Sequence, residues 1–128
     1  MKTWLRFLAL PMLLMAPACG DDDPTPESAC NDLDKIACKR TLECYSEAEL
    51  MQAGISNEAD CIRVRETSRN GLKCADFTEI NSNCPTGEKY NATKASSCVG
   101  IMSKLSCPDF LANPSPGDCD LICEAIPE

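Results

Sequence analysis

The sequence contains no histidine among its 128 residues, and it has only one tryptophan, two tyrosines and three phenylalanines. The absence of histidine removes the commonest general base in enzymes, and with it the Ser-His-Asp and Cys-His types of catalysis. The scarcity of aromatic residues leaves few large side chains for a core, so cross-links must replace part of the buried area. We therefore expect a non-enzymatic protein that depends on covalent bridges.

Positive charge is also scarce. Lysine and arginine total 12 against 20 aspartate and glutamate residues, which gives a formal net charge of −8 at pH 7. Nucleic-acid binding requires a basic surface, so we expect no nucleic-acid partner. The same charge balance disfavours adsorption to anionic lipid by charge alone.

Motifs for catalysis or cofactor binding are missing as well. There is no glycine-rich phosphate-binding loop. Paired carboxylates of the kind used by glycosidases occur at Asp32/Asp34 and Asp118/Asp120, but we interpret them as solvated residues at helix starts. Asp118-x-Asp120 also lacks the remaining oxygen ligands and the glycine of a calcium loop. We expect no catalytic residue, no metal and no cofactor.

The chain has no long hydrophobic run. Residues 7–18 are apolar but are interrupted by two prolines, and they follow the positive charges of Lys2 and Arg6. This run is too short to span a bilayer and has the length of a signal-peptide core, so residues 1–18 are predicted to be a signal peptide. Ala16-x-Ala18 fits ordinary signal peptidase, whereas Ala18-Cys19-Gly20 resembles the lipobox of bacterial lipoproteins.

Cysteine, in contrast, is abundant, and its odd count distinguishes these two processing routes. Eleven cysteines in an exported protein leave one thiol unpaired. If Cys19 is acylated, for example with palmitate, the other ten can form five disulfides. The alternative is a plain secreted protein in which Cys19 is paired and a different cysteine is free.

The remaining ten cysteines are predicted to be disulfide-bonded. None of them forms a C-x-x-C pair, which argues against thioredoxin-type exchange, haem attachment and paired zinc ligands. Cys119 and Cys123 are expected to bridge to other segments rather than to each other. Cys44–Cys61 and Cys38–Cys74 are hypothetical pairs that would staple a helical hairpin. The full set is Cys30, Cys38, Cys44, Cys61, Cys74, Cys84, Cys98, Cys107, Cys119 and Cys123.

The predicted organisation is an acidic, proline-containing tether over residues 19–29, followed by an all-α domain of about four helices over residues 30–128. Local patterns place helices at about 29–45, 47–53 and 57–70, then one that begins after Asn91 and ends before Pro108, and a short helix after Asp118. Residues 72–89 are expected to be a loop pinned by Cys74 and Cys84. Strand signals are few.

Two polar groups have alternative interpretations. Asn91-Ala92-Thr93 matches a glycosylation sequon, but Asn91 is equally explained as a helix cap. Arg63, Arg65 and Arg69 fall on both sides of one predicted helix, and we expect them to pair with nearby acidic residues.

The combined pattern resembles a family. A lipobox signal with Cys19-Gly20 and acidic residues, then Cys38-x5-Cys44 and a glycine-containing turn before Cys61, resembles the first half of small Cys-rich lipoproteins predicted in myxobacteria and related delta-proteobacteria. Tyr90 to Cys123 resembles their second half. The resemblance implies an outer-membrane lipoprotein, facing the periplasm or the surface, with a helical architecture. It implies no activity.

Three functions remain open at this point. The first is a non-enzymatic, lipid-anchored envelope protein that acts as a structural or binding module, attached to the membrane through Cys19. The second is a helical carrier of an apolar ligand, lined by the stripe Ala95, Cys98, Met102 and Leu105. The third is an inhibitor of an extracellular hydrolase that uses the loop at residues 72–89.

Overall fold

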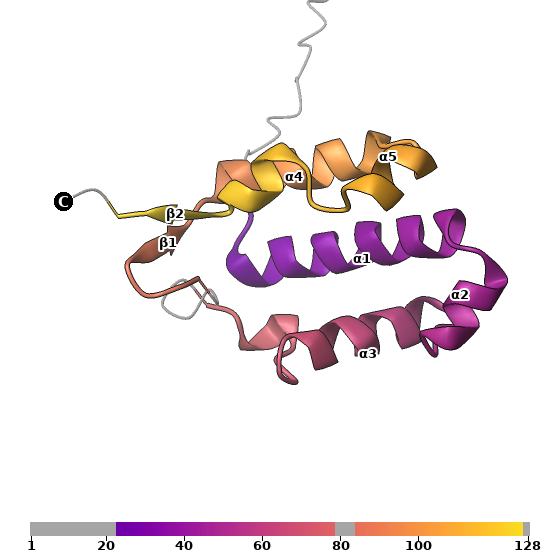
Figure 1. Cartoon of the computed structure of the whole chain (residues 1–128). Coiled ribbons are helices and arrows are strands. Elements are labelled where there is room, and N and C mark those ends of the chain that lie inside the picture. Colours follow the sequence, from indigo (N-terminus) through magenta and orange to yellow (C-terminus); the bar gives the residue numbers. More distant parts are fainter. Residues whose placement is uncertain (1–22, 79–83, 127–128) are drawn as a thin grey trace, which may run out of the picture.

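The computed structural model describes residues 23–78 and 84–126, and it confirms a small, mainly helical domain with disulfide staples (Figure 1). The expectations for the signal peptide and for Cys19 lie outside these residues. The elements in chain order are α1 (Pro26–Cys44), α2 (Glu47–Gln52), α3 (Glu58–Ser68), the 3₁₀ turn η1 (Cys74–Asp76), β1 (Glu88–Tyr90), α4 (Ala92–Lys104), α5 (Cys107–Ala112), the 3₁₀ turn η2 (Gly117–Leu121) and β2 (Cys123–Ala125).

Helix α1 is the centre of the fold. It contacts α3 and η1 on one side and α4 and α5 on the other, so the helices lie roughly side by side with α1 in the middle (Figure 1). The turn η2 packs against α4. Because α1 is shared by both halves, its side chains contribute to every hydrophobic cluster of the described domain.

The start of α1 corrects the predicted tether. Thr25 is the N-cap, with its side chain accepting a hydrogen bond from the Ser28 amide at 3.2 Å, and Pro26 occupies the first turn, where its missing N–H is no loss. The Tyr90 hydroxyl donates to the Pro24 carbonyl at 2.8 Å. Residues 24–29 therefore belong to the folded domain, and the proposed extended segment 19–29 is too long.

The other helix boundaries follow local signals. Ser46 and Glu49 form the expected capping box of α2, and Asn91 caps α4 through the Lys94 amide. Helix α3 is capped by Asn57 rather than by Ser56. After α3, the positive φ of Gly71 (83°) lets its amide bond back to the Glu66 carbonyl at 2.8 Å, which ends the helix as predicted.

The C-terminal third differs from the prediction. Helix α4 ends at Lys104, before Pro108 as predicted, but Pro108 also lies in the first turn of α5, whose N-cap Ser106 accepts from the Asp109 amide at 3.3 Å. The expected helix after Asp118 is instead the turn η2 followed by strand β2. Strand β2 pairs antiparallel with β1, with Tyr90 opposite Cys123. This pairing holds Cys123 in an extended segment.

All ten domain cysteines are paired. Cys119 and Cys123 bridge to other segments, as expected, but the hypotheses Cys44–Cys61 and Cys38–Cys74 are wrong. Helix α2 carries the chain past the end of α1, so Cys61, one turn into the antiparallel α3, lies opposite Cys38 rather than Cys44. The five bridges are Cys30–Cys74, Cys38–Cys61, Cys44–Cys107, Cys84–Cys123 and Cys98–Cys119.

The core is small and rich in sulfur. Its largest cluster joins Ala37, Cys98, Met102 and Phe110, and the largest fully buried side chains of the described residues are Cys38 and Cys98. Ala95, Cys98 and Met102 form a buried stripe on α4 as predicted, whereas Leu105, the fourth predicted member, is the C-cap of α4 and only partly buried. The interior is therefore built around disulfides where a larger domain would use aromatic and branched residues.

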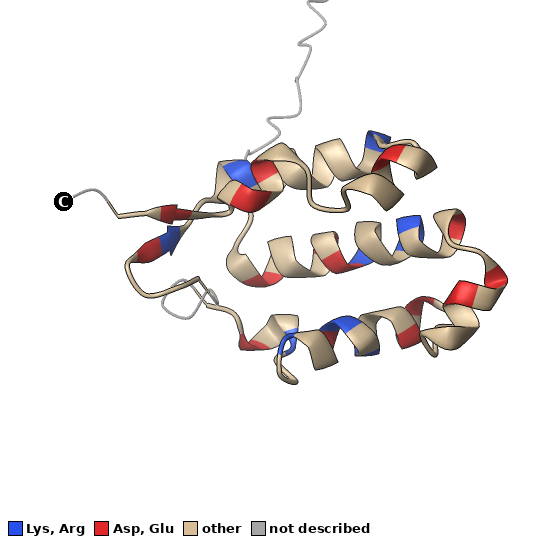
Figure 2. Ribbon diagram, in the orientation of Figure 1, with Lys and Arg blue, Asp and Glu red and all other residues tan. Residues whose placement is uncertain are grey.

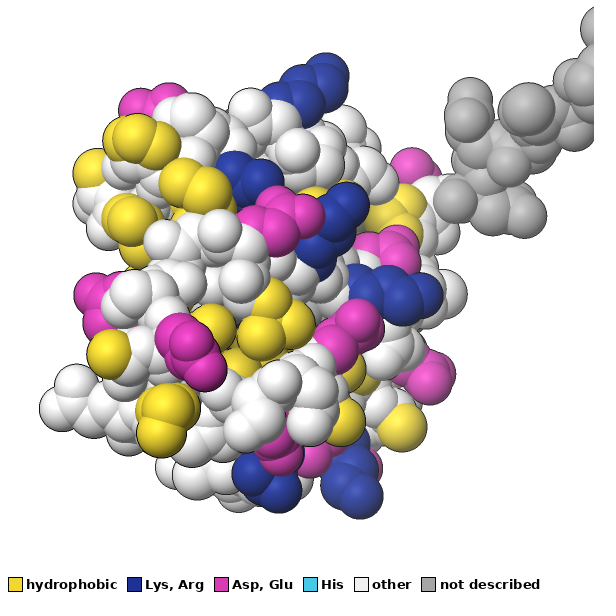
Figure 3. All heavy atoms as spheres, turned by 90° about the vertical axis from the view of Figure 1, so that its right-hand side faces the viewer, with side chains coloured by type: hydrophobic (Ala, Val, Ile, Leu, Met, Phe, Trp, Pro, Cys, Tyr) yellow, Lys and Arg dark blue, Asp and Glu magenta, His cyan; other side chains and the backbone are white. Residues whose placement is uncertain are grey.

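The surface mixes both charges. Acidic and basic residues are interspersed along the helices (Figure 2). On the side of the molecule where α2 and α5 lie, hydrophobic side chains show among the charged ones (Figure 3). The exposed large hydrophobic residues Tyr45, Met51 and Leu111 belong to segments that lie at this end of the molecule.

Candidate functional site

A buried carboxylate with two arginine partners joins α1 to α3. Asp34 is 3% exposed. Arg69 binds it with two nitrogens, each at 2.8 Å, and the Nε of Arg65 binds the same carboxylate at 2.6 Å. Asp34 is thus not the solvated residue that the sequence suggested. Of its two partners, Arg65 lies two turns into α3 and Arg69 is the residue that caps the C-terminal end of α3.

The ion cluster rests against a disulfide and an aromatic ring. Cys74, bridged to Cys30, donates no thiol proton in this state, and its Sγ lies 3.4 Å from an Asp34 oxygen. The Arg69 guanidinium lies 5.9 Å from the centre of the Phe77 ring. Cys30, Asp34 and Cys74 are close enough to resemble a metal site, but a disulfide offers no thiolate ligand.

Burial and hydrogen bonding act in opposite directions on Asp34. Burial raises the pKa of its carboxyl, but the hydrogen bonds from Arg69 and Arg65 outweigh it, so the pKa lies below its ordinary value. Asp34 in turn raises the pKa of Arg69. The pKa of Asp118 is lowered by hydrogen bonds from Lys94 and Ser97, and that of Glu124 by Asn91 and Lys89.

These lowered pKa values predict acid sensitivity. A carboxyl group whose pKa is lower in the folded state stabilises the fold above its ordinary pKa, and this stabilisation is lost as pH falls toward the folded-state pKa. We expect the melting temperature of the oxidised protein to be level near neutral pH and to drop below about pH 4. Thermal unfolding followed by circular dichroism from pH 7 to pH 2 measures this. A flat profile would contradict it.

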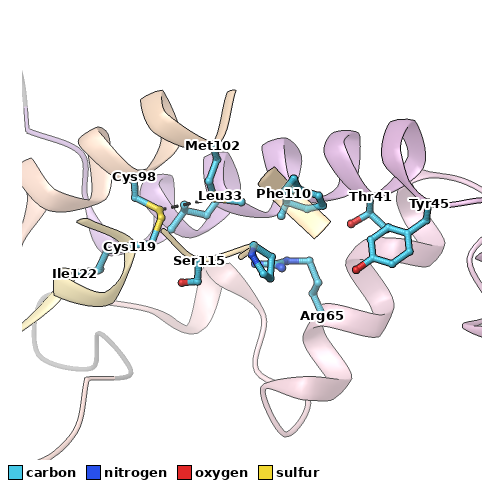
Figure 4. A pocket seen from close by; sticks show the side chains of 12 residues that line it. Leu33, Thr41, Tyr45, Arg65, Cys98, Met102, Phe110, Ser115, Cys119 and Ile122 are labelled. Carbon is cyan, nitrogen blue, oxygen red and sulfur yellow. Dashed lines mark hydrogen bonds between the residues drawn. A yellow bond between two sulfur atoms is a disulfide. The ribbon is translucent and has the colours of Figure 1, made fainter. Parts of the chain in front are cut away.

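Beside the ion cluster, a groove of about 320 Å³ runs along α1 (Figure 4). It lies between α1, α3, α4 and the C-terminal segment that contains α5 and η2. Arg65 is the charged residue among those that line it, and no carboxylate does. The lining residues are Leu33, Ala37, Thr41, Tyr45, Arg65, Cys98, Met102, Phe110, Pro114, Ser115, Cys119 and Ile122.

The two ends of the groove differ in chemistry. Thr41 and Tyr45 present hydroxyl groups at one end, with Arg65 reaching in between that end and Ser115 (Figure 4). At the other end lie Leu33, Ile122 and the Cys98–Cys119 disulfide. The groove therefore offers hydrogen-bond donors at one end and apolar contact at the other.

The Arg65 guanidinium is held in place through its Nε atom. Its Nε is bonded to Asp34, and among the described residues neither terminal nitrogen has a hydrogen-bonding partner. The side chain is 38% exposed. A guanidinium fixed in this way presents two parallel donors, which is the geometry that binds a carboxylate or phosphate.

A second, wider hollow of about 530 Å³ lies on α1 next to Val99 of α4. Ile36 and Leu42 supply apolar surface there, and it is bordered by charges of both signs from residues such as Lys39 and Glu58. It presents no preorganised donor, so we take the groove beside Arg65 as the candidate site.

Sequence reasoning found only part of this arrangement. The pairing of Arg63 with Asp60, and of Arg65 and Arg69 with Asp34, agrees with the expectation that these arginines bind acidic residues. The adjacent carboxylates Asp32 and Asp34, which the sequence indicated to be solvated, form no joint site, because Asp34 is buried against Arg65 and Arg69. The remaining members behave separately: Asp32 is exposed, Asp118 binds Lys94 and Ser97, and Asp120 accepts from Ser115.

The groove itself was not predicted. Phe110 lies on α5, a helix that the sequence did not predict, because Pro108 indicated only the end of the preceding helix. The role of Arg65 depends on a contact 31 residues away in sequence. The sequence did contain one usable signal for α5. Ser106 is followed by Pro108 and Asp109, a pattern typical of a helix start.

Comparison of this chain with known protein families, with curated proteins and with solved structures finds no match. Within residues 23–78 and 84–126, no helix combines the length and hydrophobicity needed to cross a bilayer. The five disulfides indicate an oxidising environment, either extracellular or in the cell envelope.

Proposed function

We propose that this chain is a lipid-anchored, non-enzymatic protein of the bacterial cell envelope, whose disulfide-stapled domain binds a ligand in the groove beside Arg65. Acylated Cys19 would hold it at the outer membrane. The protein would be a binding module and would not transform its ligand.

Complete pairing of the domain cysteines supports the anchor. Of the eleven cysteines, ten form the five bridges, and Cys19 is the one left over. A free thiol at this position would be open to oxidation or exchange in an oxidising compartment. Acylation removes that liability and agrees with the lipobox at residues 18–20.

The chemistry of the groove favours binding over catalysis. The groove contains a cation and several hydroxyl groups, but no carboxylate lines it, and the chain has no histidine to act as a base. Both cysteines that line it are bridged to each other. Such a site can orient and retain a ligand, whereas proton transfer at neutral pH would need a group that the lining residues lack.

Replacing Cys19 by serine tests the anchor. We expect the Cys19→Ser protein to remain unprocessed, or to be released from the membrane, because serine offers no thiol for acylation. The wild-type protein should sediment with membranes and begin at Cys19. Membrane fractionation with mass spectrometry of the N-terminal peptide measures both properties.

Asp22→Ser is the matched control, since it changes a neighbouring residue and leaves Cys19 in place. It should fractionate as the wild type does. If the Cys19→Ser protein were cleaved after Ala18 and still sedimented with membranes, the anchor would have to lie elsewhere and the lipoprotein proposal would fail.

A carrier of an apolar ligand is the second candidate, and the apolar end of the groove favours it. Co-purification of a neutral lipid, detected by native mass spectrometry, would support this function over ligand binding at Arg65. Inhibition of a hydrolase receives no comparable support. In the described part of residues 72–89, Cys74 and Phe77 are buried and so are not available to insert into an enzyme.

A further inference from the structure

The groove beside Arg65 combines a positive end with an apolar end, and this combination specifies a class of ligand. The inference rests on the proposed binding function and names what is bound.

The positive charge in the groove is only partly neutralised. Asp34 shares its single negative charge between two guanidinium groups, and Arg69 takes up both of its oxygens. Glu66 adds a second negative charge near Arg69. Arg65 therefore shares its counter-charge with Arg69, and it lines the groove, where no carboxylate opposes it (Figure 4).

The side chain of Arg65 is also preorganised. The 2.6 Å bond from its Nε to a buried carboxylate fixes the plane of the guanidinium before any ligand arrives. An anion that binds there loses less side-chain entropy than it would with a free surface arginine. The hydroxyl groups of Thr41 and Tyr45 line the same groove and are further hydrogen-bond donors there (Figure 4).

The rest of the groove excludes a purely polar ligand. Leu33, Met102, Phe110 and Ile122 line it together with the Cys98–Cys119 disulfide. An inorganic anion would leave this apolar surface in water, whereas an aliphatic chain would cover it. The volume of the groove gives the scale of the ligand: about 320 Å³ holds roughly ten non-hydrogen atoms at ~30 Å³ each. That is one short chain and not the paired chains of a phospholipid.

We propose that the groove binds a small, unbranched monocarboxylate of about eight carbons in all, its carboxylate on the terminal nitrogens of Arg65 and its chain against Leu33 and Ile122. Octanoate is the probe of this class, because it has the charge and approximately the atom count that the groove accommodates.

Titration with octanoate labelled at the carboxyl carbon tests the proposal. The processed, acylated protein is placed in nanodiscs of zwitterionic lipid, and empty nanodiscs correct for partition of octanoate into lipid. We expect saturable binding at one site, seen as a shift of the carboxyl resonance. Arg65→Gln should weaken binding by about tenfold or more, because a charge-assisted pair of hydrogen bonds is lost.

Arg63→Gln is the matched control, since Arg63 lies on the same helix and pairs with Asp60 outside the groove. It should bind octanoate as the wild type does. Tyr45→Phe provides a second variant that leaves the ion cluster intact, and it should weaken binding a few-fold by removing one hydroxyl. Circular dichroism confirms that each variant is folded.

Titrations with three further compounds complete the test. Octyltrimethylammonium has the same chain with a positive head and should not bind, and acetate should bind far more weakly than octanoate. Equal binding of the cation, unchanged binding in Arg65→Gln, or no saturable binding would each overturn the proposal. Tighter binding of an N-acetylated apolar dipeptide acid would assign the site to a peptide instead. None of these outcomes affects the Cys19→Ser fractionation, so failure here is distinguishable from failure of the anchored binding module.

Discussion

Reduction of the five disulfides is expected to unfold the domain. The bridges close segments of 21 to 63 residues, and each native disulfide typically stabilises a small protein by ~2–4 kcal/mol. The contributions of overlapping loops are not additive. Even so, several bridges together equal the ~5–15 kcal/mol by which an ordinary domain is stable.

The composition of the core makes this effect large. Cys38 and Cys98 are the largest side chains among the described residues that are fully buried, so reduction alters the interior itself as well as the chain connectivity. Among the described residues Phe77 and Phe110 are the buried aromatic side chains, so aromatic packing compensates little for the loss of the bridges. Short helices such as α2 and α5 are also unstable in isolation, because helix formation is cooperative and needs more than two turns.

Circular dichroism at 222 nm in excess reductant measures the outcome. We expect loss of most of the helical signal at room temperature, with recovery after reoxidation. The oxidised protein in the same buffer, with the reductant omitted, is the control. A reduced protein that kept its helical signal and its melting temperature would show that the bridges are not what holds the fold together.

Asp34→Asn is expected to have the second largest effect. It leaves two guanidinium groups, one of them only 16% exposed, without their negative partner in a partly buried site. Breaking a buried ion pair by removing one partner typically lowers the free energy of unfolding by ~3–5 kcal/mol. Asparagine keeps the shape and one acceptor oxygen, so the loss reports mainly the charge.

Asp32→Asn is the matched control, because Asp32 lies two residues away on the same helix and is exposed. Urea unfolding of the oxidised proteins gives the free energies. We expect Asp32→Asn to lie within about 0.5 kcal/mol of the wild type. Equal stability of the two variants would mean that the Asp34 cluster contributes little to the fold.

Elements with signals inside one short window were predictable from the sequence. The capping box at Ser46 and Glu49, the cap at Asn91 and the glycine at position 71 each act within a few residues, and all three occur where expected. Pro108 is a partial exception. Its missing N–H correctly predicts that the preceding helix does not continue, but the same feature suits the first turn of the next helix.

Features that depend on distant partners were not predictable. Cys44 pairs with Cys107, 63 residues away, and nothing near either residue specifies the other. In the sequence, Asp34 resembles any exposed acidic residue of a helix. Only the packing of α3 against α1 places Arg65 and Arg69 beside it. Strand β2 exists because β1 pairs with it and because Cys84–Cys123 ties the two segments together. The sequence of a single chain does not show which distant residues or strands pair with each other.

If Cys19 carries the proposed lipid, the early start of α1 determines how far the domain can move from the membrane. With the Pro24 carbonyl bonded to Tyr90, five residue steps separate a lipid at Cys19 from the folded domain, a reach of at most ~17 Å. This is about half the ~30 Å thickness of the hydrocarbon layer of a bilayer. The domain would be confined to a thin zone above the lipid headgroups. Amphiphiles partition into this zone, so their local concentration is higher there than in bulk solution, and a modest intrinsic affinity would suffice to fill the groove.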